Sequence, residues 1–196
     1  MMYKNSQSGF SLVETLVAIT ILLLVIIGPM TISMNTSRST SFASEQVVAF
    51  FLAQEGIEIA QKARDDLILN AFLPPADVNY SATPWSTFAD SASGPYANCF
   101  SSTGCALDML DGGGVSLSPA TCSGSACRMY YDSTRELTRY NLDSSGTIAP
   151  YSRSVTFTAV APHEIQVVSR VYWRTGSRRD FQEVILETSL FNVYGN

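Results

Sequence analysis

An uninterrupted apolar run follows a short polar leader at the start of the chain. The 23 residues from Thr15 to Ser37 carry no formal charge and are mostly Leu, Ile, Val and Met. About 20 apolar residues in a helix cross a hydrocarbon core of roughly 30 Å. The run is therefore long enough to span a membrane, and it is too long and too uniformly apolar for a buried core helix.

One carboxylate, Glu14, lies just before this run, where an ionisable side chain is costly and indicates a function. The only charge that precedes it is Lys4. An ordinary secretory signal would have a shorter apolar stretch of about 7–15 residues and a small-residue cleavage site behind it. The stretch from Met30 to Met34 is a poor candidate for such a site. A plain single-pass anchor explains the length of the run and leaves Glu14 unexplained.

Beyond the run the pattern becomes that of an amphipathic helix between Glu45 and Leu69. Five apolar residues recur at helical spacing on one face: Val48, Leu52, Ile59, Ala63 and Leu67. We expect one helix from residue 10 to about residue 69, ended by Pro74 and Pro75. Its apolar face is predicted to pack against the chain's own sheet.

Residues 70–127 have little regular pattern and contain two close cysteine pairs. We expect an ordered excursion of short strands or turns. Local disulfides Cys99–Cys105 and Cys122–Cys127 are favoured in an oxidising environment, although four cysteines also allow crossed pairing. A zinc site is the weaker alternative, because its usual C-x2–4-C spacing is met by the second pair alone.

Apolar and polar residues alternate from Arg128 onward, as in strands. The predicted strands are Arg128–Tyr131, Leu137–Tyr140, Ser154–Val160, Ile165–Trp173 and Phe181–Val193, with a hairpin turn at Thr175–Arg179. Short connections between successive strands predict an antiparallel meander with one face on the helix. The expected fold class is α+β.

Charge and chemistry then exclude several functions. The net charge of −5 opposes general binding to nucleic acid, and Arg174, Arg178 and Arg179 are read as a solvated hairpin tip. A catalytic triad would depend on His163, the only histidine, so we expect no enzyme. Asp108 and Asp111 lack the spacing of a calcium loop. No metal site or cofactor is predicted.

The segment Gly9-Phe10-Ser11-Leu12-Val13-Glu14 resembles the amino terminus of type IV prepilins and of type II secretion pseudopilins. The resemblance implies cleavage after Gly9 and N-methylation of Phe10. It also implies that Glu14 acts in assembly, since it would be the fifth mature residue. A buried carboxylate there can pair with the new amine of a neighbouring subunit in a fibre.

The same resemblance implies a pilin-like fold, in which a long helical spine packs on a C-terminal antiparallel sheet. Members of this family often have a helix-kinking proline near mature position 22. Here Pro29, preceded by Gly28, would be mature position 20. A kink or local melting at Gly28–Pro29 is still expected, in a shifted register.

A second segment, Ala53-Gln54-Glu55-Gly56-Ile57-Glu58 followed by Arg64-Asp65, looks like minor pilins of the type V group and the related pseudopilin I. This resemblance points to a subunit that initiates or primes assembly. Together with the amino terminus it covers about a third of the chain.

The expected organisation has five parts. These are a cleaved leader (1–9), a transmembrane and assembly helix (10–37), the amphipathic half of the spine (38–69), a disulfide-stapled variable region (70–127) and the sheet of the head (128–196). The implied partners are prepilin peptidase, other major and minor pilin-like subunits, an inner-membrane assembly platform and, before assembly, membrane lipid. The implied location is the bacterial inner membrane, with a single span and the head outside the cytoplasm, and then a pilus or pseudopilus fibre. A competing class is a single-pass extracytoplasmic binding or adhesion protein.

Overall fold

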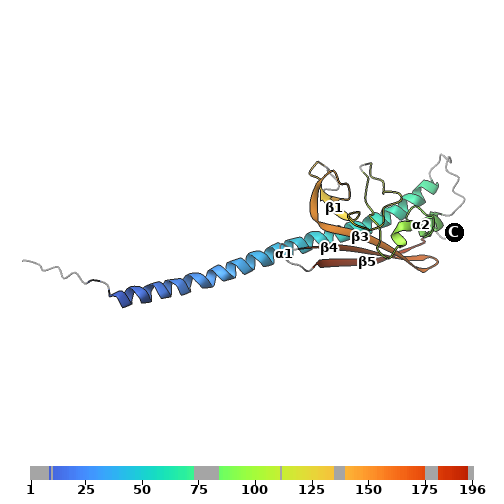
Figure 1. The fold of residues 1–196 in the computed structure, drawn as a ribbon. Helices are drawn as coiled ribbons and strands as arrows, with labels where there is room; N and C mark the ends of the chain where they lie inside the picture. The colour runs from blue at the N-terminus through green and yellow to red at the C-terminus, as the bar shows by residue number, and fades with distance from the viewer. Residues whose placement is uncertain are drawn as a thin grey trace, which may run out of the picture. The chain divides into compact units, whose positions relative to one another are not determined.

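The protein has an α+β, pilin-like fold in which part of a long N-terminal helix packs on an antiparallel sheet, of which five strands lie in the described part of the chain (Figure 1). This computed structural model describes residues 9, 11–72, 84–110, 112–134, 140–174 and 181–193. The chain divides into two compact units, Met1–Ser44 and Glu45–Asn196.

Helix α1 runs from Leu12 to Phe72, close to the predicted bounds of 10 and 69. In the first unit it contains the whole apolar run, and each large apolar side chain from Leu12 to Met34 is about half exposed or more. An 18-residue window of the helix has a mean hydropathy of 2.5. By length and composition, α1 is therefore able to cross a membrane.

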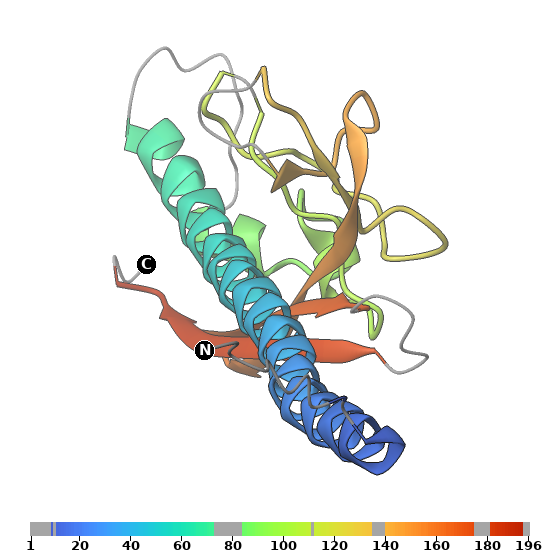
Figure 2. The same ribbon diagram turned by 90° about the vertical axis from the view of Figure 1, so that its left-hand side faces the viewer.

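In the second unit, α1 lies across one face of the sheet (Figure 2). The predicted apolar face is confirmed for Leu52, Ile59, Ala63 and Leu67, while Val48 is only half-buried. Small residues widen this face. The buried positions added to the prediction are the small residues Ala49, Ala53, Gly56 and Ala60, together with Ile68. The small residues let the helix backbone approach the sheet closely.

The sheet has the strand order β2-β1-β3-β4-β5, and all its pairs are antiparallel. Its strands are β1 (Arg128–Tyr131), β2 (Tyr140–Asn141), β3 (Thr147–Ala161), β4 (Glu164–Trp173) and β5 (Gln182–Phe191). The predicted simple meander is therefore wrong at one place, because β1 lies between β2 and β3. Tyr131 pairs with Tyr140 on one side and with Thr147 on the other.

A glycine allows the return from β2 to the far side of β1. A Cβ atom on Gly146 would lie 2.7 Å from the carbonyl oxygen of Tyr131, which is closer than real Cβ contacts. Only a residue without a side chain fits between β2 and β3 at this distance. The passage of the chain from β2 on one side of β1 to β3 on the other therefore depends on Gly146, and strand periodicity does not reveal this requirement.

The strand interiors agree with the predicted alternation. In β4, Ile165, Val167, Val171 and Trp173 are buried on one face together with Ser169. The predicted strand Leu137–Tyr140, the turn Thr175–Arg179 and the helix stop at Pro74 and Pro75 lie partly or wholly outside the described residues.

The cysteine-containing region contains two short helices where strands or turns were expected. Helix α2 spans Pro84–Ala89 and the 3-10 helix η1 spans Ala97–Phe100. Trp85 and Phe88, three residues apart in α2, are both buried, and the Trp85 indole donates to the carbonyl of Pro162 at 2.9 Å. The core beneath α1 is thus completed by aromatic side chains, of which Phe88, Tyr96 and Phe100 surround Phe157.

Candidate processing and assembly site

The peptide bond between Gly9 and Phe10 precedes the first residue of α1, Leu12, by only a few residues. Gly9 is exposed, and a Cβ atom on it would meet nothing within 4 Å. Phe10 lies outside the described residues. The predicted cleavage position therefore lies at the exposed Gly9, shortly before the first residue of α1.

Glu14 lies in the first turn of α1. The carbonyl of Ser11 accepts hydrogen bonds from the Glu14 and Thr15 amides at 3.0 and 3.2 Å, so the helix begins directly after Ser11. A carboxylate in the first turn interacts favourably with the positive end of the helix dipole. Its side chain is exposed, so it is free to meet a group from another molecule.

Gly28 and Pro29 lie inside α1, which continues through both. The Thr31 hydroxyl donates to the Gly28 carbonyl at 2.8 Å, next to the position where proline removes a backbone donor. A Cβ atom on Gly28 would meet nothing within 4 Å. The kink or melting expected at this position stays a prediction.

Residues 4–28 match a known family, described as the prokaryotic N-terminal methylation motif. The motif supports a type IV pilin-like prepilin. The matched residues include Gly9, Phe10, Glu14 and Gly28, and they end one residue before Pro29. No curated protein and no solved structure is significantly similar to this chain.

A prepilin motif implies processing by prepilin peptidase and assembly with other pilins. The apolar first part of α1 fits a membrane-anchored pilin. The motif does not extend to Ala53–Glu58, on which the resemblance to minor pilins of the type V group and pseudopilin I rests.

The second unit contains a buried ion cluster that the sequence did not predict. Arg153 of β3 is 1% exposed, and its side chain pairs with the carboxylates of Glu55 at 2.7 Å and Asp108 at 3.3 Å. The guanidinium also donates to the carbonyls of Leu52 at 3.3 Å and Leu107 at 3.2 Å. Arg153 thus joins the helix, the cysteine-containing region and the sheet.

The two carboxylates of this cluster differ in their surroundings. Burial raises the pKa of Glu55 above its ordinary value of 4.5, and the nearby Arg153 charge only partly opposes this. Asp108 also accepts a hydrogen bond from the Leu142 amide at 2.7 Å. The aspartate that we considered as a calcium ligand is therefore a partner of Arg153, while Asp111 lies outside the described residues.

Both predicted disulfides are present, and both closed loops contact β3 beside Arg153. The bridges are Cys99–Cys105 and Cys122–Cys127. Cys105 exchanges two backbone hydrogen bonds with Val155, at 2.9 and 3.1 Å, and the Cys127 carbonyl accepts from the Arg153 amide at 2.9 Å. The disulfides thus hold the segments that provide Arg153 with Asp108 and with backbone partners.

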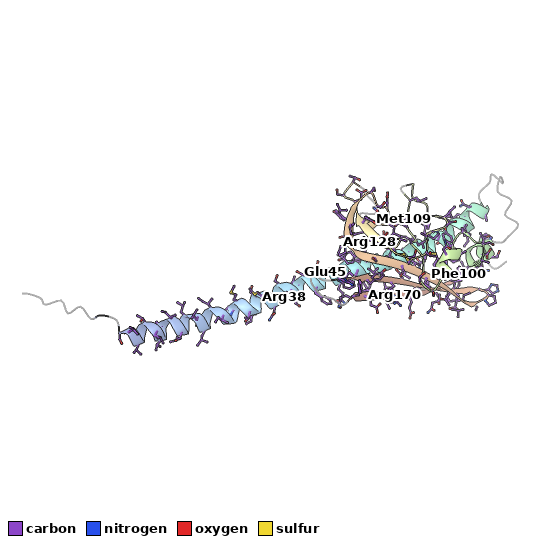
Figure 3. All side chains as sticks on the ribbon, viewed as in Figure 1. Arg38, Glu45, Phe100, Met109, Arg128 and Arg170 are labelled. Atoms are coloured by element: carbon purple, nitrogen blue, oxygen red, sulfur yellow. A yellow bond between two sulfur atoms is a disulfide. The ribbon has the colours of Figure 1, made fainter. Side chains whose placement is uncertain are left out.

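A second set of contacts anchors the start of the head at Glu45, which Figure 3 labels. The Trp173 indole donates to the Glu45 carboxylate at 3.1 Å, and the Tyr151 hydroxyl donates to its backbone carbonyl at 3.3 Å. Burial raises the pKa of Tyr151 to about 12. These two aromatic side chains fix the first turn of α1 in the second unit to β3 and β4.

Among the described residues, no group of three or more His, Cys, Asp or Glu side chains is placed to hold a metal ion. His163 lies exposed at the turn between β3 and β4, where its ring contacts the Asn192 amide at 3.4 Å. That contact is a surface interaction at the end of the sheet.

Proposed function

We propose that this protein is a minor pilin or pseudopilin, a structural subunit of a type IV pilus or of a type II secretion pseudopilus. The observation that carries the proposal is the methylation motif at residues 4–28, with Glu14 exposed in the first turn of α1. In this account, prepilin peptidase cleaves after Gly9 and the new terminus at Phe10 is N-methylated. The head is displayed outside the cytoplasm and performs no catalysis.

Assembly follows from the chemistry of the exposed apolar helix. Before assembly, the side chains from Leu12 to Met34 are covered by lipid. In the fibre they pack against the helices of neighbouring subunits extracted through an inner-membrane platform. Glu14 pairs there with the amine of Phe10 on a neighbour, which offsets the cost of burying either charge alone. The resemblance of the segment Ala53–Glu58 to minor pilins favours the role of a subunit that initiates or primes the fibre.

The test is incorporation of a Glu14 variant into assembled fibres. In cells that make prepilin peptidase and the other pilin-like subunits, Glu14→Leu should be cleaved normally and lost from sheared fibres by roughly tenfold or more. Thr15→Leu, a neighbouring change without loss of charge, should behave as the parent protein. Normal incorporation of Glu14→Leu would rule out this role of the carboxylate.

The alternative is a single-pass membrane-anchored protein whose head binds a ligand or surface as a monomer. It would remain with the membrane in every preparation, and it would not co-purify with other pilin-like subunits.

A further inference from the structure

Strand β5 has one edge without a described partner. It is the last strand in the sheet order, and all ten of its residues, Gln182–Phe191, pair with β4 in one continuous register. In Figure 1, β5 lies at the outer margin of the described sheet. Every second residue of an edge strand points its backbone N–H and C=O groups away from the sheet, where they can pair with another strand.

The edge of β5 lacks most of the features that usually block strand addition. Sheet edges are protected by charged side chains, especially lysine, and by proline, bulges or short length. Of these features, β5 has the charged side chains Glu183 and Glu187. β5 contains no proline and no lysine, and its register with β4 has no bulge. At the opposite edge of the sheet, the described part of β2 is two residues long, Tyr140 and Asn141. The long, regular edge of β5 is therefore the one suited to a partner strand.

The side chains of β5 on the helix side are incompletely covered. Val184 and Leu186 are only half-buried, whereas Val167 and Val171 in the neighbouring β4 are fully buried. An added strand would remove these apolar side chains from water, which is favourable.

The opposite face of β5 carries a pattern of acid, apolar and acid at Glu183, Ile185 and Glu187. Ile185 is 44% exposed. On the β4 side, Arg170 (Figure 3) contacts the Glu183 carboxylate at 3.5 Å, and Gln166 donates to Glu187 at 3.4 Å. A cationic or amide side chain on β4 thus contacts each acid from a diagonal position, and the edge without a described partner offers the same acids to a second strand.

We propose that the edge of β5 without a described partner binds an extended segment of another protein, which adds a further strand beside β5. That segment carries Lys or Arg at two positions that flank an apolar residue in alternation, so that its cations lie beside Glu183 and Glu187 and its apolar side chain beside Ile185. Opposite charges on neighbouring strands are stabilising and like charges are destabilising. A second copy of β5 would bring carboxylates against carboxylates, so the charges favour a basic partner over self-association.

Binding of designed peptides to the full chain in detergent micelles tests this proposal. The probe is a fluorescent seven-residue peptide in which threonine alternates with lysine, valine and lysine. We expect it to bind at least tenfold more tightly than the peptide with glutamate in place of lysine. A third peptide, with proline at two threonine positions, removes backbone donors and should bind at least tenfold more weakly than the probe.

Charge reversal on the protein distinguishes the edge from general attraction. Glu183→Lys/Glu187→Lys should reverse the preference between the basic and acidic peptides. Glu58→Lys/Asp65→Lys, with the same change in net charge on α1, should keep the parent's preference. The proposal is wrong if the basic peptide does not bind, if the proline peptide binds equally well, or if both double variants lose binding to the same extent. A β5-dependent dimer of the full chain in sedimentation would show that a second copy occupies this edge, and it would also contradict the proposal.

Discussion

The Arg153 guanidinium donates to the Glu55 carboxylate at 2.7 Å, Nη1 to Oε2, and this contact joins β3 to α1 across 98 residues of sequence. The arginine side chain is fully buried and that of Glu55 is 26% exposed. A buried charge of this kind is tolerated only while its partners are in place. The ion pair therefore depends on the packing of α1 on the sheet, and variants that break it report on that packing.

Removal of Glu55 should destabilise the head strongly. Glu55→Ala leaves Arg153 with Asp108 as its only carboxylate, and we expect a loss of about 3 kcal/mol in the free energy of unfolding. Urea unfolding of the full chain in detergent, followed by the fluorescence of the buried Trp85 and Trp173, measures this loss. Glu58→Ala, an exposed change one turn away, should cost less than about 0.5 kcal/mol.

The raised pKa of Glu55 predicts the sign of a pH dependence. The folded state holds the Glu55 proton more tightly than the unfolded state does. The protonated carboxyl therefore makes its full contribution to the free energy of unfolding below about pH 4.5, and this contribution is lost as the pH rises through the pKa of the folded state. Compared with Glu55→Gln, the parent protein should lose free energy of unfolding between pH 4.5 and 7. The measurement is the difference in urea midpoint between the two proteins at several pH values. A parent protein that gains stability over the variant in this range would show that the Arg153 charge outweighs burial.

Gly56 allows a close approach of α1 to β4. A Cβ atom there would overlap the Ser169 hydroxyl oxygen and lie 3.2 Å from Cδ of Arg153. Gly56→Ala should therefore cost about 1–3 kcal/mol through overpacking, and Gly56→Ala/Ser169→Gly should recover part of that loss. Gly112→Ala is the matched control, because nothing lies within 4 Å of a Cβ atom at Gly112. Equal stability of Gly56→Ala and the parent would mean that the helix and the sheet are not in close contact here.

The two disulfides should differ in their importance. Both Cys99 and Cys105 are fully buried, whereas Cys122 is partly exposed. Replacing both cysteines of a native disulfide with alanine typically costs about 2–5 kcal/mol in a small domain. We expect the upper part of this range for Cys99→Ala/Cys105→Ala, since Cys105 also pairs with Val155 beside the ion cluster. The cost for Cys122→Ala/Cys127→Ala should be smaller, and the opposite order in urea unfolding would contradict this assignment.

Much of the fold was predictable because it follows from periodicity. The helical spacing from Leu52 to Leu67 and the alternation from Ile165 to Trp173 each reflect one buried face. The apolar run follows from length and composition instead, and it forms the exposed first part of α1. The start of β3 at Thr147 was missed by seven residues. There the inward-facing positions include Arg153, and a charged residue at a buried position interrupts the expected alternation.

The remaining features depend on contacts between residues far apart in sequence. The partners of Arg153 come from Glu55 and Asp108, 98 and 45 residues away, and no spacing rule connects them. The place of β1 between β2 and β3 depends on the fit of Gly146 against Tyr131. The N-terminal methylation motif was recognisable for the opposite reason, since Gly9, Phe10 and Glu14 lie within six consecutive residues.

The central claim is processing at the bond between Gly9 and Phe10, and mass spectrometry of the amino-terminal peptide tests it most directly. The protein should be purified from membranes of cells that contain prepilin peptidase, with cells that lack the peptidase as the control. We expect a mature chain that begins at N-methyl-Phe10 in the cells with peptidase and an unprocessed chain in the cells without it. An intact Met1 in the cells with peptidase, or a terminus near residue 30, would contradict it.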